Sequence, residues 1–221
     1  MKKSLLGLAL GLSMLLAGNA QAFNVTPLSG VYPSNHKGGV LTITNDGNEE
    51  KIIQIRVDAL TLENGKQVRT PTQDIRVAPS VITMAPNSKQ TVRYLHTNLD
   101  PSKELAYRVS VKEIPSNIDE TVAGVRYLFE YDFSWIWRGN DMKPSLKSTW
   151  VQDGDKWDLK ITNEGNATAQ LVDIEAGSSN KSGLVGYILP NETQVIDIDA
   201  KAKVGEIKVL LNQRSSTLKV E

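Results

Sequence analysis

The sequence predicts an all-β protein built as two tandem β-sandwiches. Short runs in which apolar and polar residues alternate recur along the chain after residue 22, and this period is typical of strands with one buried face. Turn-forming stretches rich in Gly, Pro, Asn and Asp separate these runs. No segment has a convincing helical period. Strands of this length and spacing pack most simply as sandwiches.

Residues 1–22 have the features of a secretory signal peptide. Two lysines precede the apolar run 5–17, and Ala20 and Ala22 supply the small residues at positions −3 and −1 of a cleavage site. The apolar run is shorter than the roughly 20 residues that a membrane-spanning helix needs. We therefore expect cleavage after Ala22 and export of the chain that follows.

The composition of the exported chain argues against some kinds of partner and excludes cysteine-based links. Its 23 basic and 25 acidic residues give a net charge of 23 − 25 = −2, which provides no long-range attraction for nucleic acid or anionic lipid. The chain has no cysteine, so disulfides and a lipid anchor on an N-terminal cysteine are both excluded. A partner must therefore be recognised by shape and apolar contact.

The first sandwich is expected to occupy residues 23–139. Its strands are predicted at 23–28, 40–44, 52–62, 75–78, 81–84, 91–95, 107–114 and 125–137. Pro27 indicates an edge or a kink in the first of them. A polar segment with Gly and Pro follows, and we interpret residues 140–144 as a linker.

The second sandwich is expected at 145–221 and is smaller. Its strands are predicted at 146–151, 157–162, 169–176, 185–189, 194–198, 206–211 and 216–220. The turn at 163–166 repeats the turn at 45–48, and each follows an Ile-Thr strand end. A sandwich of this size has a modest core, so we expect it to lean on the first.

The run at 125–137 is unusual in its length and aromatic content. At about 3.3 Å per residue it would span roughly 40 Å, about twice an ordinary strand. Leu128 and Ile136 are the two exceptions to its alternation. Such an aromatic face is longer than a core of this size needs, which suggests that part of it serves a partner. The residues of one parity are Val125, Tyr127, Phe129, Tyr131, Phe133, Trp135 and Trp137.

Catalytic and metal-binding patterns are weak. His36 and His96 lie in polar sequence surroundings without metal-ligand spacing, so both are expected at the surface. No Gly-rich phosphate loop leads from a strand into a helix, so no nucleotide is expected. The aspartates at 153 and 155 are interpreted as a turn, and those at 197 and 199 as the solvent face of a strand, not as a calcium site. We expect no enzyme activity, no cofactor and no metal site.

The first half of the exported chain contains the segments APSVITMAPNSKQTVR and YRVSVKEIP, in this order, before the aromatic run. The first segment is similar to a signature of the periplasmic chaperones of the chaperone–usher pilus pathway, and the second resembles the strand that precedes the partner-binding strand of that family. ITNEGNATAQLVDI and GYILPNETQVIDI are similar to the smaller domain of these proteins. The resemblance implies two immunoglobulin-like sandwiches in a boomerang, working without ATP in the periplasm.

The resemblance also implies how such a protein works. The last strand of its first domain is lent to a pilus subunit that lacks one strand, and an outer-membrane usher then receives the subunit. Phe133 and the two tryptophans after it are expected to belong to the core instead. The residues that match the lent strand are Val125, Tyr127 and Phe129, with Ala123 and Tyr131 as flanking candidates.

One feature departs from many members of that family, which hold the subunit's C-terminal carboxylate with two basic residues. The best-matching positions here are Ser29 and Ser134, and a hydroxyl cannot form the charge-assisted pair that a carboxylate prefers. A divergent archaic or alternate branch has a Tyr-Arg pair at the start of the preceding strand, which makes Arg108 the candidate anchor. Lys37 and Lys112 are weaker candidates, and a merely structural arginine on a strand is an equally open interpretation of Arg108.

The sequence is also compatible with two other functions. An immunoglobulin-like periplasmic or surface binding module that does not serve pilus subunits is the main alternative, and a hydrolase is a remote one. A co-purifying small subunit would favour the chaperone, whereas carbohydrate binding by the isolated protein would favour the module.

Overall fold

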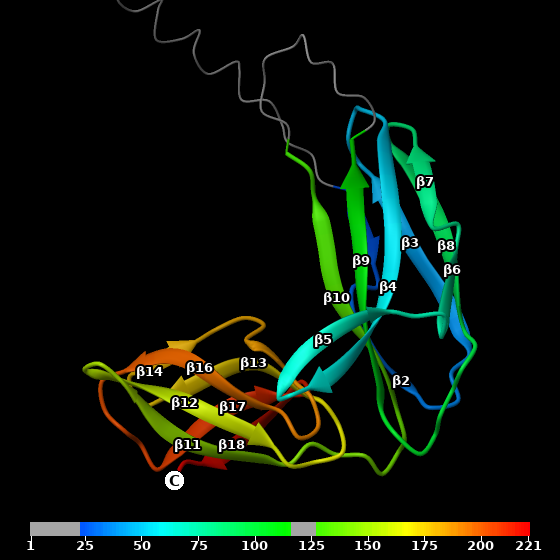
Figure 1. Cartoon of the computed structure of the whole chain (residues 1–221). Coiled ribbons are helices and arrows are strands. Elements are labelled where there is room, and N and C mark those ends of the chain that lie inside the picture. The colour runs from blue at the N-terminus through cyan, green and yellow to red at the C-terminus, as the bar shows by residue number, and fades with distance from the viewer. Residues whose placement is uncertain (1–22, 116–126) are drawn as a thin grey trace, which may run out of the picture.

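In the computed structural model, which describes residues 23–115 and 127–221, the chain forms two all-β units set at an angle to each other (Figure 1). The described residues contain no helix, and the predicted all-β class is confirmed. No described helix is therefore long and apolar enough to cross a membrane. The predicted signal peptide, residues 1–22, lies outside the described residues.

The first unit is a sandwich of two sheets. One sheet has the order β1-β3-β8-β6, and the other has the order β2-β10-β9-β4-β5, with β7 paired to β4. The strands are β1 (Asn24–Thr26), β2 (Gly30–Pro33), β3 (Gly38–Asn45), β4 (Lys51–Glu63), β5 (Lys66–Pro71), β6 (Ile75–Ala78), β7 (Val81–Met84), β8 (Ser88–His96), β9 (Leu105–Ile114) and β10 (Glu130–Arg138).

The strand predicted at 23–28 ends at Thr26, just before Pro27, and β2 at Gly30–Pro33 was not predicted. Before the proline, β1 pairs with β3 in one sheet. After it, β2 pairs in parallel with the last four residues of β10 in the other sheet. Because proline has no N–H to donate to a ladder, the chain can leave one sheet there and join the other.

The second unit repeats the architecture with shorter sheets. Its sheets have the orders β11-β12-β16 and β14-β13-β17-β18, with β15 paired to β13. The strands are β11 (Leu146–Asp153), β12 (Lys156–Asn163), β13 (Ala169–Ala176), β14 (Ser179–Lys181), β15 (Gly186–Ile188), β16 (Thr193–Ala200), β17 (Glu206–Leu211) and β18 (Arg214–Lys219).

Each unit has its own hydrophobic core, formed by the inward residues of its alternating strands.

The two similar turns that begin at Asn45 and Asn163 have the same internal hydrogen bonds. Asn45 and Asn163 are fully buried, and the side chain of each donates to nearby backbone carbonyls and accepts from the amide two residues later. Asparagine is favoured at such turns because its amide can satisfy backbone groups that no strand pairs with.

The junction between the units is held by a buried ion pair. Arg138 at the end of β10 contacts Glu104, with Nε and Oε2 2.5 Å apart, and also donates to the Thr168 carbonyl. Glu104 accepts in turn from the Thr168 amide at 2.7 Å. The segment 139–145 joins β10 to β11 beside this pair, and it passes so close to Gly165 that a Cβ there would lie 2.4 Å from the Lys143 carbonyl oxygen. The two units are therefore fixed to each other by specific polar contacts.

The prediction that His96 lies at the surface is wrong. The side chain is buried, its Nε2 lies 3.0 Å from the Tyr107 hydroxyl, and its Nδ1 accepts from the Asn98 amide. Its ring also packs edge-on against Trp137. The sequence neighbours of His96 are polar, but the strands β9 and β10, which lie against it in space, supply aromatic rings. Asp74 is the charged group of this cluster, and it accepts from the Tyr107 hydroxyl.

Acidification is expected to weaken the first unit through this histidine. Burial lowers the pKa of His96, and the nearby Asp74 opposes the shift only in part. A lowered pKa means that the unfolded chain binds a proton more readily, so stability is lost as the pH falls from about 6.5 toward the folded-state value. Urea denaturation at pH 7.5 and pH 5.5 measures this loss. His96→Gln should show a smaller difference between the two pH values, and an unchanged difference would contradict this account.

Candidate functional site

Among the described residues, the first part of strand β10 has a free edge. It pairs with β9 throughout, but β2 covers its other side only from Trp135 to Arg138. The Glu113 amide donates to the Phe129 carbonyl, so the backbone of Phe129 faces β9. Since backbone direction alternates along a strand, the amides and carbonyls of Glu130 and Asp132 face the side that no described strand occupies, whereas Ser134 lies where the pairing with β2 begins. This edge is open to another strand.

The strand is shorter than the sequence predicted. It begins at Glu130, so Tyr127 and Phe129 are described but precede the strand, and Ala123 and Val125 lie outside the described residues. The neighbouring β9 ends at Ile114, and the register places Tyr127 opposite Pro115. Because proline cannot donate to the ladder, pairing stops at that point. The prediction of one continuous strand over 125–137 is therefore wrong for its described first part.

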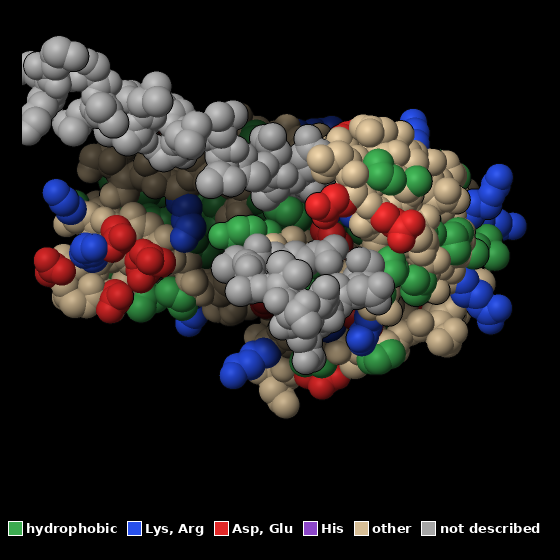
Figure 2. Space-filling model, turned by 90° about the horizontal axis from the view of Figure 1, so that it is seen from above, with side chains coloured by type: hydrophobic (Ala, Val, Ile, Leu, Met, Phe, Trp, Pro, Cys, Tyr) green, Lys and Arg blue, Asp and Glu red, His purple; other side chains and the backbone are tan. Residues whose placement is uncertain are grey.

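Apolar side chains are exposed at this end of the first unit. Tyr127 is 69% exposed and Leu128 is 40% exposed. Phe129 and Tyr131 are half-buried against the first core, and the Tyr131 hydroxyl donates to the Phe23 carbonyl at 2.7 Å. The view from above shows hydrophobic side chains at several places on this face, with acidic and basic side chains among them (Figure 2). An apolar surface thus continues from the core to the free edge.

The other aromatic residues of the run belong to the core. Phe133, Trp135 and Trp137 are buried, which confirms the prediction made for them. Trp135 packs against Tyr94 with ring centroids 4.4 Å apart. Ile136, one of the two exceptions to the alternation, is buried on the opposite face, where the second unit covers it. The exception in the sequence therefore has a structural cause.

The two serines that replace the expected basic residues meet at the cleft between the units. Ser29 and Ser134 both line a cavity of about 60 Å³. Its other lining residues come from β2, β10 and the second unit: Gly30, Val31, Ile136, Gln170, Tyr187 and Gln213. Burial raises the pKa of Tyr187, while Arg108 and hydrogen bonds with Gln170 and Ser29 act in the opposite direction. The cavity is thus polar on one side and close to a cation.

That cation is Arg108, which the sequence had singled out. It lies opposite Ser134 in the register of β9 and β10, and its Nη1 donates to the Ser134 hydroxyl at 2.9 Å. Only 19% of its side chain is exposed. Lys112 is exposed on the same face of β9, four residues or about 13 Å further along, and Lys37 is exposed in the turn before β3. The structure brings Arg108 and the two serines together but places both lysines elsewhere.

Several residues of the cleft were missed from the sequence. Asp132 pairs with Arg108 and also with Arg69 of β5, both at 2.5 Å. The hairpin of β4 and β5 reaches the second unit, where Gln67 donates to the Tyr187 carbonyl at 2.8 Å (Figure 1). The alternation had placed Asp132 on a polar face, but nothing in the sequence connects that face with β5. The folding of the hairpin across the cleft creates these contacts.

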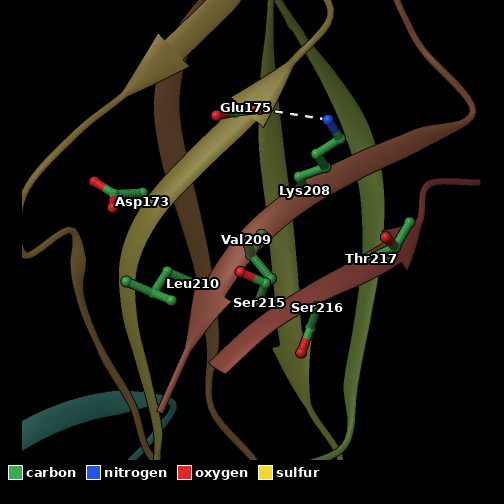
Figure 3. A pocket seen from close by; sticks show the side chains of 8 residues that line it. All are labelled: Asp173, Glu175, Lys208, Val209, Leu210, Ser215, Ser216 and Thr217. Atoms are coloured by element: carbon green, nitrogen blue, oxygen red, sulfur yellow. Dashed lines mark ion pairs between the residues drawn. The ribbon is translucent and has the colours of Figure 1, made fainter. Parts of the chain in front are cut away.

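A second hollow lies on the outer surface of the second unit (Figure 3). Its only ion pair joins Glu175 to Lys208 at 3.9 Å, and both side chains are well exposed. Such a pair adds little to binding or stability. Within residues 23–115 and 127–221, no group of three or more His, Cys, Asp or Glu side chains is arranged to hold a metal ion. The cleft and the free edge of β10 therefore remain the strongest candidates.

The chain is similar to known proteins in sequence and in fold. Residues 22–143 match the family described as pili and flagellar-assembly chaperone, PapD N-terminal domain. The uncharacterised fimbrial chaperone YcbF of Escherichia coli K12 is 23% identical over 188 residues, which cover 81% of this chain and 78% of that protein.

Solved structures have the same fold. A chain of the CsuC–CsuE chaperone–tip subunit complex from the archaic Csu pili of Acinetobacter baumannii matches with a TM-score of 0.72 and 22% identity, over 90% of this chain and 98% of that one. A chain of the Salmonella enterica SafA pilin–SafB chaperone complex matches with a TM-score of 0.66 and 18% identity, over 92% and 98%. Because the family match covers more than half of its length, the chain belongs to the pilus and flagellar-assembly chaperones.

Proposed function

We propose that this chaperone captures a pilus subunit in the periplasm by lending it the free edge of β10. The observation that carries the proposal is the backbone of Glu130 and Asp132, which pairs with no described strand on its outer side and lies beside exposed apolar side chains. An edge of this kind can complete a sheet that lacks a strand, with backbone hydrogen bonds supplying affinity and alternate side chains supplying specificity. Similar structures contain a chaperone bound to a pilin or a tip subunit, which supports the same class of partner.

The lent segment in this proposal extends from Ala123 to Tyr131. Tyr127 and Phe129 would enter the apolar groove of the subunit, Val125 would continue the row, and Ala123 and Tyr131 would flank it. Since β9 ends before Pro115, the subunit itself would pair with this part of the run. The same proposal includes cleavage after Ala22, domains at 23–139 and 145–221, and transfer of the subunit to an outer-membrane usher.

Arg108 is the proposed anchor for the C-terminal carboxylate of the subunit. It is a half-buried cation beside the cavity that Ser29 and Ser134 line. An arginine binds a carboxylate through paired, charge-assisted hydrogen bonds, which fix the register of the incoming strand. Lys37 and Lys112 are exposed residues outside this cavity, so they are weaker candidates for the same role.

Arg108→Ala is expected to weaken subunit capture by about 1.5–3 kcal/mol, because one charge-assisted bond is lost. Co-expression with a pilus subunit of the source organism, followed by co-purification and titration, measures the effect. Arg108→Lys keeps the charge but loses the planar fork, and it should restore binding only in part. Lys112→Ala is the matched control on the same strand. Normal capture by Arg108→Ala together with failure of Lys112→Ala or Lys37→Ala would assign the anchor to a lysine.

A further inference from the structure

Asp132 lies between two arginines and binds a different one with each oxygen. Its Oδ1 is 2.5 Å from Nη2 of Arg108, and its Oδ2 is 2.5 Å from Nη1 of Arg69. About 29% of its side chain is exposed. The carboxylate therefore occupies the guanidinium that we assign to the subunit, while solvent and other solutes can still reach it.

Arg108 has no second carboxylate among the described residues. Its Nη1 donates to the neutral Ser134 hydroxyl, its Nη2 also lies 3.5 Å from the Asp132 backbone carbonyl, and its buried Nε has no acceptor in the part of the chain that the structure describes. A guanidinium has five N–H donors, so only part of the hydrogen-bonding capacity of Arg108 is used. It can therefore accept a different arrangement of partners without losing its contact with Ser134.

We propose that Asp132 is an internal substitute for the subunit's terminal carboxylate, which holds Arg108 in the free chaperone and is displaced on capture. This inference rests on the proposed anchoring of the subunit at Arg108. Two carboxylates on one guanidinium repel each other, and the incoming group brings further contacts along β10 that Asp132 cannot offer. An uncharged chain end cannot compete for Arg108 in this way, so Asp132 selects for a true carboxylate terminus.

Arg69 can keep its ion pair with the Asp132 carboxylate after that carboxylate has left Arg108. The Oδ2 contact with Arg69 already exists, so Asp132 need only give up its bond to Arg108. The β4–β5 hairpin that carries Arg69 is fixed at its other end, because Gln67 donates to the Tyr187 carbonyl and to Glu192 of the second unit. Arg69 is thereby kept across the cleft from β10. The charge of Asp132 stays neutralised after the exchange.

While Asp132 occupies Arg108, the carboxylate of the subunit cannot bind there. The apparent affinity for the subunit is therefore lower than the intrinsic affinity, in proportion to the fraction of molecules in which Arg108 is free. Asp132→Asn removes the competing charge and should therefore tighten binding of a free carboxylate about two- to fivefold, the range expected for a partly exposed ion pair. The opposite result is expected if Asp132 simply positions Arg108, because binding would then weaken in the variant.

The test uses two synthetic peptides with the last eight residues of a pilus subunit, one ending in a free carboxylate and one in an amide. Both are titrated into the full-length mature chaperone, and the Arg108 Nε–H resonance reports occupancy of the guanidinium. Asp58→Asn is the matched control, since Asp58 is the cross-strand neighbour of Arg108 on β4 but pairs with Arg56. It removes the same charge nearby without removing a bond to Arg108.

The proposal predicts that Asp132→Asn binds the free-acid peptide more tightly than the parent protein does, and that its affinity for the amide peptide is not increased. Asp132→Asn should also bring no gain in affinity when Arg108→Ala is present. Asp58→Asn should bind the free-acid peptide nearly as the parent protein does. Equal or weaker binding of the free acid by Asp132→Asn overturns it, as does an equal gain in Asp58→Asn. If the parent protein and its Arg108→Ala variant bind both peptides alike, the anchoring at Arg108 itself is wrong. Thermal melting of each variant separates these outcomes from loss of the fold.

Discussion

Replacing Trp135 with glutamate is expected to unfold the first unit, whereas replacing Tyr127 with glutamate should leave it folded but unable to capture a subunit. Trp135 is completely buried between the sheets, so the change removes a large ring and buries a charge. We expect a loss of at least about 4 kcal/mol of stability. Tyr127 has the same parity but is 69% exposed, so its replacement costs the free protein little.

Thermal melting of both isolated variants, followed by co-purification with a pilus subunit, separates the two effects. In a lent strand, a charge at position 127 would enter an apolar groove and oppose binding by its desolvation. Tyr127→Phe keeps the ring and should capture normally. Normal capture by Tyr127→Glu would show that this residue does not enter the subunit.

The second large effect is expected at the junction between the units. Arg138→Ala leaves Glu104, whose side chain is only 4% exposed, without its cation. Removing one partner of a buried ion pair typically destabilises by about 3–5 kcal/mol, because the remaining charge stays buried and uncompensated. Urea denaturation measures the change in the free energy of unfolding.

Two further variants test the cause of this loss. Glu104→Gln in the Arg138→Ala background removes the unpaired charge and should recover part of the stability. Lys147→Ala disrupts an exposed ion pair with Glu164 and should change stability by less than about 1 kcal/mol. If Arg138→Ala cost no more than Lys147→Ala, the buried pair would not be holding the junction.

The strands were predictable where their residues alternate. The predicted ranges 75–78, 81–84, 169–176 and 206–211 coincide with β6, β7, β13 and β17. In contrast, β5 and β14 were missed because both are short and mostly polar, and their hairpin partners define them. Period-two alternation reports burial of one face, so a strand that buries little gives no signal.

The candidate site was predictable only where a single strand carries it. Arg108 and the aromatic run could be named from the sequence, but Asp132 gained its role from Arg69, which is 63 residues away in the chain. His96 was misjudged for the same reason, since Tyr107 and Trp137 reach it from other strands. The limit of pairing between β9 and β10 had a visible signal in Pro115, which follows the neighbouring strand β9 and is not part of the run itself.

Residue-resolved amide hydrogen exchange of the chaperone, alone and in complex with a pilus subunit, tests the lent edge most directly. Glu130 and Asp132 have backbone amides on the free side of β10, whereas Tyr131 and Phe133 face β9. Capture by strand addition predicts strong slowing of exchange at Glu130 and Asp132, with much smaller changes at Tyr131 and Phe133. A stable complex in which Glu130 and Asp132 exchange as fast as in the free protein would contradict the proposed function.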